Sequence, residues 1–181
     1  WEFVVVKDAE LRKKVLDIFV EARFRTHLME TTRVAEFRHP GAARGATEFV
    51  RFKNAPVIII VCGDPRTIQA SVLAASFLNQ ANVFHENLAN VTQMIHLAAH
   101  AIGLGASWVS VSPPTDERIR SALGIPDIFR IETIVPVGYP TYKPAPPYRR
   151  KLEELIHWDR YDTKKFRSDE QIIEFIKQLR N

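Results

Sequence analysis

The chain has little cysteine, little glycine and no long apolar run. Only one of its 181 residues is a cysteine, Cys62, so no disulfide can form within it, and a reducing compartment is the simpler expectation. Its apolar runs are far too short to cross a bilayer, and the first residues lack the pattern of a secretion signal. We therefore expect a cytoplasmic protein in which Cys62, inside the run VIIIVC, packs in the core.

A strong excess of one charge is also missing. The 25 basic residues face 21 acidic ones, which gives a formal net charge of +4, and the basic residues are scattered along the chain. Such a mild excess suits an anionic cofactor as well as nucleic acid. A chain that is 46% hydrophobic and 25% charged is typical of one globular domain, so we expect a single domain over residues 1–181.

Strand and helix patterns alternate along the chain, which indicates the α+β class, close to α/β. Four short runs rich in β-branched residues predict strands, and each is bounded by turn-forming residues. These runs are WEFVVV (1–6), VIIIVC (57–62), SWVSV (107–111) and IETIVPVG (131–138).

Helical periodicity predicts four helices. Asp8 is expected to cap the first, Thr115 to cap a short helix that stops at Gly124, and the capping box Ser168–Gln171 to open the last. The clearest helix is expected over 86–104, with one apolar face. That face is predicted to carry Leu88, Val91, Ile95, Ala98 and Ile102.

Two stretches lack the sequence pattern of a regular helix or strand of the core. Residues 24–52 contain turn residues among five arginines and predict a broken helix or a lid. Residues 139–181 begin with a segment rich in Pro and Lys and predict a C-terminal arm that leads into the final helix.

The segment GLGASW (103–108) places two of the seven glycines at the end of the apolar helix. One interpretation is a helix cap followed by a tight entry into a strand. The other is a backbone that must approach a flat ligand closely.

Three segments together resemble the nitroreductase family of FMN-dependent oxidoreductases: APVIIIVCGDPR (55–66), LAAHAIGLGASW (97–108), and VPVGYP followed by RRKLEELIHWDRY (149–161). The resemblance implies a mixed, mainly antiparallel sheet flanked by helices. It also implies an intertwined homodimer whose active sites, built from both subunits, each bind one FMN. The implied reaction passes hydride from the co-substrate NAD(P)H through FMN to a nitroaromatic or quinone, and residues 24–52 would cover the flavin.

The resemblance also implies which residues bind the cofactor. The stretch after Trp108 would lie against the flavin ring, which carries over to Ser110, Val111, Ser112 and Pro113. A backbone N–H aimed at flavin N5 would help hydride transfer, and Ser112 is the candidate donor because Pro113 has no N–H. The alternative is that SPPT is only a helix-capping turn.

Arg149 and Arg150 match the basic position that binds the FMN phosphate in the family, and Arg149 is the closer match. The alternative is a solvated pair of charges. Because the cofactor carries the chemistry, no side chain is assigned as a catalytic acid or base, and no metal ligand is expected.

The resemblance has one departure. Family members begin with a helix that bears an Arg-Ser-x-Arg type motif, whereas this chain begins at Trp1, and we expect that it is truncated. The alternatives left open are a flavin destructase, which WVSV resembles, a deiodinase-like member of the fold, and a non-catalytic flavin-binding scaffold. The ending HWDRY favours the reductase.

Other candidates favour structure over chemistry. His96 and His100 have the spacing of metal ligands, but the intervening residues lack the zincin glutamate, so we expect them to face a subunit interface or a polar cavity. No nucleic-acid or membrane partner is expected. The remaining aromatic candidates are predicted to lie in the core: Trp1, Trp108 and Trp158.

Overall fold

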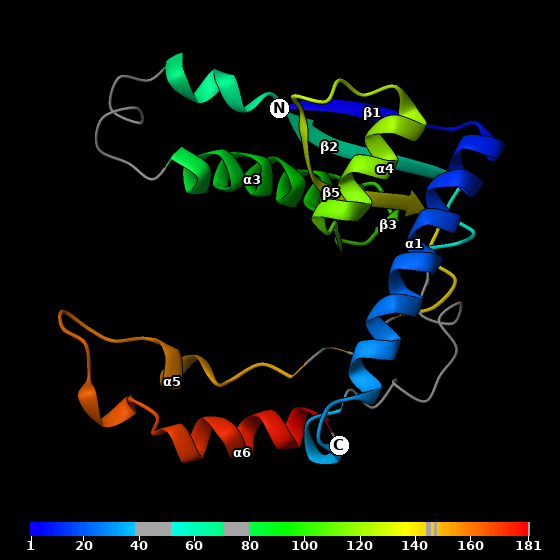
Figure 1. Ribbon diagram of the computed structural model, residues 1–181. Coiled ribbons are helices and arrows are strands. Elements are labelled where there is room, and N and C mark those ends of the chain that lie inside the picture. Colours follow the sequence, from blue (N-terminus) through cyan, green and yellow to red (C-terminus); the bar gives the residue numbers. More distant parts are fainter. Residues whose placement is uncertain (39–51, 71–79, 144–145, 147, 181) are drawn as a thin grey trace. The chain divides into compact units, whose positions relative to one another are not determined.

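The computed structural model describes residues 1–38, 52–70, 80–143, 146 and 148–180. The chain divides into two compact units, and helix α1 (Ala9–Thr31) runs from the first into the second (Figure 1). Unit 1 comprises Trp1–Arg25 and Gly45–Thr141, and unit 2 comprises Thr26–Arg44 and Tyr142–Asn181.

Unit 2 consists of residues from the two stretches that lack the pattern of core elements, the predicted lid and the predicted arm. Residues 24–31 continue α1 without a break, so the helix is not interrupted at the start of the predicted lid. Residues 39–51 of that segment lie outside the described residues. The single domain, the lid over 24–52 and the arm over 139–181 stay predictions.

Unit 1 is built on a five-stranded sheet of strand order β1-β2-β5-β3, with β4 also paired to β5 (Figure 1). All of these pairings are antiparallel, which confirms the expected sheet flanked by helices. The strong β-propensity of the VIIIVC run explains why β2 lies in the interior of the sheet. The strands are β1 (Glu2–Val6), β2 (Val57–Gly63), β3 (Gly105–Ala106), β4 (Val109–Ser110) and β5 (Arg130–Gly138).

The helices of unit 1 begin and end largely at the expected signals. Asp8 caps α1 as predicted, because its Oδ1 accepts the N–H of Leu11 at 2.9 Å. Among the described residues, no helix is long and apolar enough to span a membrane. The other helical segments of this unit are the 3-10 turn η4 (Pro65–Ala70), α3 (Gln80–Ala101) and α4 (Pro113–Leu123).

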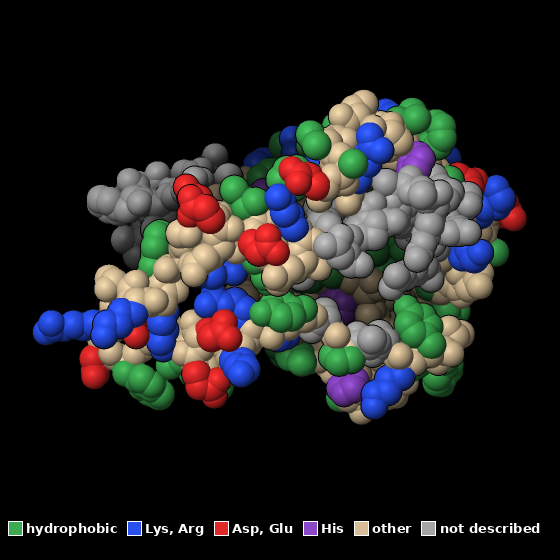
Figure 2. All heavy atoms as spheres, turned by 90° about the horizontal axis from the view of Figure 1, so that it is seen from below, with side chains coloured by type: hydrophobic (Ala, Val, Ile, Leu, Met, Phe, Trp, Pro, Cys, Tyr) green, Lys and Arg blue, Asp and Glu red, His purple; other side chains and the backbone are tan. Residues whose placement is uncertain are grey.

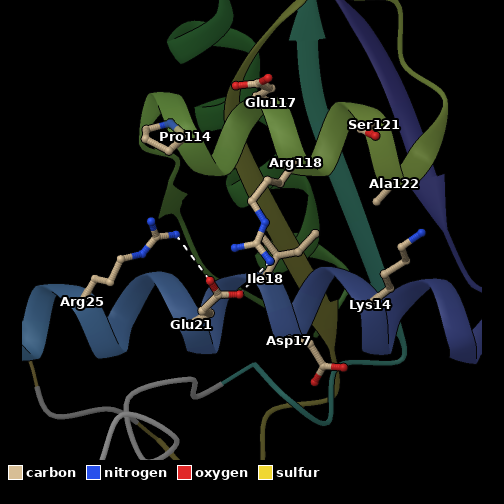
Figure 3. A pocket seen from close by; sticks show the side chains of 10 residues that line it. All are labelled: Lys14, Asp17, Ile18, Glu21, Arg25, Pro114, Glu117, Arg118, Ser121 and Ala122. Atoms are coloured by element: carbon tan, nitrogen blue, oxygen red, sulfur yellow. Dashed lines mark hydrogen bonds and ion pairs between the residues drawn. The ribbon is translucent and has the colours of Figure 1, made fainter.

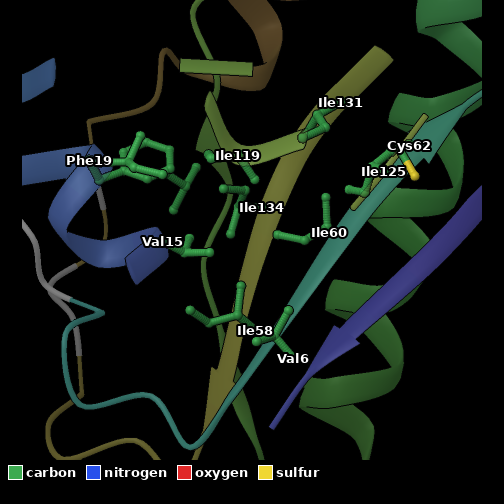
Figure 4. Close-up of a cluster of buried hydrophobic side chains, with 12 residues drawn as sticks. Val6, Val15, Phe19, Ile58, Ile60, Cys62, Ile119, Ile125, Ile131 and Ile134 are labelled. Atoms are coloured by element: carbon green, nitrogen blue, oxygen red, sulfur yellow. The ribbon is translucent and has the colours of Figure 1, made fainter. Parts of the chain in front are cut away.

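Two apolar clusters cover the two faces of the sheet. On one face, α1 and α4 contribute Val15, Phe19 and Ile119 to a cluster with Ile60 and Ile134 of the strands (Figure 4). On the other face, α3 packs on the strands. The second cluster consists of Val61, Phe84, Leu88 and Val135. Since both faces are covered, the inner strands are apolar on both sides.

The buried face of α3 differs from the predicted one. Leu88 is buried as predicted, but Ala98 and Ile102 are exposed, Ile102 by 72%. The buried positions also include Thr92, whose hydroxyl donates to the carbonyl of Leu88 at 2.8 Å, and Ala99. Because α3 is apolar on several sides, periodicity did not distinguish the stripe that faces the sheet.

The two glycines of GLGASW have separate structural roles. Gly103 is left-handed at φ 78°, and its N–H bonds the carbonyl of His100 at 3.1 Å while the N–H of Leu104 bonds that of Ala99 at 2.8 Å. These are the two bonds of a Schellman cap, so the capping interpretation is confirmed at Gly103. Gly105 pairs with Gly138 in the sheet.

Unit 2 has no buried residue among those the structure describes. Its helix α6 (Asp169–Arg180) begins at the predicted capping box: the N–H of Ser168 bonds Oε1 of Gln171 at 3.0 Å, and the N–H of Gln171 bonds Oγ of Ser168 at 3.4 Å. The other short elements of the unit are η1 (Ala35–Phe37), α5 (Leu152–Leu155) and η5 (Thr163–Lys165).

Polar and ring contacts at the surface link the elements of unit 2. Lys177 of α6 pairs with Glu36 of η1 at 3.2 Å, and the guanidinium of Arg167 lies 4.9 Å from the centre of the Phe175 ring. The rings of Phe175 and Tyr148 lie 5.5 Å apart. The face drawn in Figure 2 shows hydrophobic side chains exposed among charges of both signs.

The prediction that the tryptophans lie in the core is wrong. Trp1 is 66% exposed, Trp108 is 40% exposed and Trp158 is 81% exposed. Aliphatic neighbours in sequence suggested burial, but Trp1 precedes a strand at one end of the strand order, and Trp158 lies in a loop beside Asp159, whose φ is positive at 59°.

Candidate functional site

The N-terminus of α4 lies directly after β4 and carries most of the predicted cofactor site. Ser112, with φ −81° and ψ 154°, is the N-cap, so the prediction that Thr115 caps this helix is wrong. Pro113 and Pro114 occupy the first helical positions, where the fixed φ of proline suits the helix and its missing N–H costs nothing. The carbonyl of Ser112 accepts the N–H groups of Thr115 and Asp116 at 2.9 and 2.8 Å.

The prolines reduce what this helix start offers to a ligand. A helix N-terminus normally presents several free N–H groups and so attracts phosphate. Here Pro113 and Pro114 have none, and those of Thr115 and Asp116 are bonded. The N–H of Ser112 has no hydrogen-bond acceptor in the described part of the chain, while its hydroxyl pairs with Oγ1 of Thr115 at 2.8 Å. The site therefore suits a single acceptor atom better than a phosphate.

The sheet holds the stretch before α4 on one side. Val109 is buried in the first cluster and Val111 packs against that cluster. Ser110 pairs with Thr133 of β5, and Ser110 and Ser112 are exposed. The structure thus brings Ser110, Val111, Ser112 and Pro113 together as one strand-to-helix connection with its valines inward and its serines outward.

A buried ion pair fixes α4 to β5 below this connection. Asp116 and Arg120 are only 8% and 7% exposed, and Nε of Arg120 donates to Oδ2 of Asp116 at 3.0 Å. The other oxygen of Asp116 accepts the N–H of Ile131 at 2.9 Å, and Arg120 also donates to the carbonyl of Asp127 at 3.0 Å. Sequence reasoning missed this pair, although its spacing of four residues on a helix was a signal.

The two predicted phosphate-binding arginines differ in their contacts. Nη1 of Arg149 donates to the carbonyl of Tyr148 at 3.1 Å, and no acidic side chain among the described residues pairs with it. Arg150 donates to Oε2 of Glu154 at 3.1 Å and to its carbonyl at 3.2 Å. Arg149 is therefore the more available of the two, but it belongs to unit 2 and Ser112 to unit 1, so a joint site stays a prediction.

A groove of about 620 Å³ lies between α1 and α4 (Figure 3). In it, Glu21 accepts a hydrogen bond from Arg118 at 2.7 Å and pairs with Arg25 at 3.7 Å. The hydrogen bond from Arg118 holds the pKa of Glu21 below its usual value. Charges of both signs meet here, and none of the predicted site residues lines the groove. Its lining consists of Lys14, Asp17, Ile18, Glu21, Arg25, Pro114, Glu117, Arg118, Ser121 and Ala122.

A buried thiol and a partly buried histidine take no part in this connection. Cys62 is buried and free, and burial raises the pKa of its thiol to about 11, which confirms the packing role. The ring of His96 stacks on Trp108 at 6.2 Å between centres, and its buried Nε2 has no hydrogen-bond partner among the described residues. Burial lowers the pKa of His96.

Residues 1–139 match the family model of the nitroreductase family. The chain therefore belongs to this family. It is 30% identical over 147 residues to a protein of Methanothermobacter thermautotrophicus named "Putative NADH dehydrogenase/NAD(P)H nitroreductase", a match that covers 80% of this chain and 58% of that protein. The chain thus spans about three-fifths of the length of this relative.

Two other similarities concern a further relative and the fold. A 5,6-dimethylbenzimidazole synthase of Rhodospirillum rubrum is 30% identical over 154 residues, which cover 83% of this chain and 67% of the synthase. An FMN-dependent nitroreductase from Clostridium difficile R20291 has the same fold, with a TM-score of 0.59, 22% identity, and coverage of 89% of this chain and 76% of the other. The fold is thus that of the nitroreductase-family oxidoreductases.

Proposed function

We propose that the protein is an FMN-dependent oxidoreductase that passes hydride from NAD(P)H through FMN to a nitroaromatic or quinone acceptor. The observation that carries this proposal is the N–H of Ser112, an exposed residue, which has no acceptor in the described part of the chain. Bound FMN would supply hydride transfer, and the protein would supply orientation and charge.

Each predicted residue has a defined task in this proposal. The N–H of Ser112 would be the hydrogen-bond donor to the flavin ring, and the backbone of Ser110, Val111 and Pro113 would hold the ring from one side. Val109 and Val111 point into the core and hold this backbone in place. Because the donor is a backbone group on a fixed helix start, the site needs no reorganisation when the ring binds.

Arg149 is proposed to bind the FMN phosphate. A dianionic phosphate needs a guanidinium whose donors are not already used by a carboxylate, and Arg149 meets that need better than Arg150. Two prolines at the start of α4 leave few N–H groups for the phosphate there, which is why a separate cation is required.

The proposal includes a homodimer in a cytoplasmic location. Apolar residues of α3, Met94 and Leu97, are 63% and 54% exposed, and unit 2 buries no side chain among its described residues. A second copy that covered these surfaces would remove both exposures from water. The location rests on the lone Cys62, which is free.

The test compares two changes at one position in the full-length protein. Ser112→Pro removes the backbone N–H, and the φ of −81° lies near that of proline, whereas Ser112→Ala removes only the hydroxyl. We expect a yellow wild-type protein that NAD(P)H bleaches, unchanged bleaching in Ser112→Ala, and a roughly tenfold or greater loss in Ser112→Pro. Equal behaviour of the two variants would contradict the role of the amide.

One relative favours a second candidate function. The 5,6-dimethylbenzimidazole synthase is as similar in identity as the reductase-named relative, so a flavin-consuming activity is the alternative. Aerobic turnover of reduced FMN distinguishes the two: a reductase returns the flavin spectrum, whereas a destructase loses it. A colourless protein that takes up no FMN would contradict both the reductase and the flavin-consuming activity. A yellow protein that NAD(P)H does not bleach would agree with the deiodinase-like and scaffold alternatives.

A further inference from the structure

A β-bulge in β5 redirects one carboxylate. The register between β2 and β5 shifts between Val61 and Cys62, which leaves Glu132 as the extra residue of β5. As a result Ile131 and Ile134 both pack in the first cluster, although regular alternation would turn them to opposite faces. Bulges of this kind re-aim side chains and are frequent beside active sites.

On the other face of the sheet, Glu132 meets a histidine of α3. Its Oε2 lies 2.6 Å from Nδ1 of His85. The Glu132 side chain is mostly covered, with 18% of it exposed, whereas the His85 side chain is 58% exposed. Because a carboxylate only accepts, Nδ1 carries the proton, and Nε2 is the nitrogen left to exchange protons; it has no partner among the described residues.

This pair lies beside the connection proposed to contact the flavin. Ser110 of β4 pairs with Thr133, the neighbour of Glu132 in β5. Since Val109 and Val111 turn toward the first cluster, Ser110 faces the side of the sheet on which Glu132 meets His85. The carboxylate that orients the exposed imidazole of His85 is therefore one residue along β5 from the strand partner of Ser110.

We propose that His85 is the proton donor to the acceptor and that Glu132 is its positioning residue; this rests on the proposed function. If reduced FMN supplied a hydride, with both of its electrons, a quinone acceptor would become a hydroquinone monoanion with one oxygen left to be protonated. His85 in its protonated form gives the Nε2 proton to that oxygen and becomes neutral, and solvent reprotonates the exposed ring. Glu132 keeps Nδ1–H bonded throughout, which holds the ring in one orientation.

The experiment separates the two half-reactions of full-length protein loaded with FMN. His85→Ala is compared with His100→Ala, a second exposed histidine of α3 with no side-chain partner among the described residues. FMN affinity is measured first, by flavin fluorescence. Anaerobic stopped-flow then follows reduction by NAD(P)H and, separately, reoxidation by a quinone.

We expect both variants to bind FMN and to be reduced like the wild type. Reoxidation by the quinone slows by about a hundredfold or more in His85→Ala alone, and added imidazole restores it. Glu132→Gln slows the same step and shifts the Nδ1 proton resonance of His85. The proposal is overturned if His85→Ala reoxidises like His100→Ala, if it loses FMN, or if imidazole does not restore the rate. A wild-type protein that binds no FMN, or that NAD(P)H does not reduce, overturns the proposed function itself.

Discussion

Units 1 and 2 differ in what holds each of them together. Unit 1 has a sheet covered on both faces, and Ile60 and Ile134 at its centre are fully buried. Unit 2 has no buried residue in its described part, and Leu152 and Phe166 are 63% and 72% exposed. Unit 1 can therefore draw on apolar burial, whereas unit 2 relies on ion pairs and ring contacts at the surface.

Under the proposed function, the two units have different tasks. Exposed ion pairs contribute little, so a surface that covered the elements of unit 2 would add most to their stability. The Ser112 amide rests on the well-packed unit, which suits a group that must not move. Arg149 belongs to the unit without a core, and an ordered phosphate contact there depends on what covers that unit. Four predictions test this contrast, from the largest expected effect to the smallest.

The ion pairs of the two units are expected to differ most. Asp116→Ala would leave the buried Arg120 with the exposed Asp127 as its remaining acidic partner among the described residues, and the N–H of Ile131 unpaired, so we expect a loss of about 3 kcal/mol or more in the free energy of unfolding. Lys177→Ala, which breaks the exposed pair with Glu36, should cost about 1 kcal/mol or less. Urea denaturation measures both, and equal losses would contradict the contrast.

Isoleucine-to-alanine changes in the two units compare how much apolar burial stabilises each of them. Ile60→Ala creates a cavity at a fully buried position and should lower the free energy of unfolding by about 2–5 kcal/mol. Ile173 is 44% exposed, so Ile173→Ala should lower the free energy of unfolding clearly less. Sedimentation of Ile173→Ala tests the dimer: weaker association supports a second copy on unit 2, and unchanged association contradicts it.

The arginines test the phosphate contact. Arg149→Gln should weaken FMN binding by roughly ten- to a hundredfold, because a hydrogen bond to a charged group is lost. Arg150→Gln should weaken it less, since Glu154 already occupies that guanidinium. Flavin fluorescence titration measures both dissociation constants. A larger effect at Arg150 would reverse the assignment.

The smallest effect concerns pH. Burial lowers the pKa of His96 in the folded protein, so the unfolded chain, whose histidine titrates near pH 6.5, binds the proton first as pH falls. His96 thus makes the protein less stable below about pH 6.5. The variant His96→Phe should lose less stability between about pH 7 and pH 5 than the wild type. His100→Phe, which replaces an exposed histidine of the same helix, is the control. The prediction is contradicted if His96→Phe loses as much stability over this pH range as the wild type.

Local sequence signals predicted the elements of the fold well. The cap at Asp8, the stop at Gly124 and the box Ser168–Gln171 all act where expected, because each depends on a few neighbouring residues. The cap at Thr115 failed because Ser112 also suits an N-cap and the prolines that follow it fit inside the helix. The prediction that Trp158 is buried was wrong because burial depends on packing against residues far away in the sequence.

The candidate site was predicted only as far as it is local. Ser110 to Pro113 are adjacent in sequence, so a resemblance was enough to propose them as a cofactor site. The pair of His85 and Glu132 was missed because a bulge in β5, visible only in the register with β2, brings the two together. The contact of Asp116 with Ile131 was missed for a related reason, since it joins a helix to a strand.

By itself, the sequence determined which segments form strands and helices, which residues cap them and which family the chain resembles, because these depend on short-range periodicity and backbone chemistry. Only the tertiary structure decided which side of α3 is buried, which donor at the start of α4 is left unbonded, and where the β5 carboxylate points. Those outcomes depend on which surfaces pack against each other across the sheet, and these surfaces are formed by residues far apart in the chain.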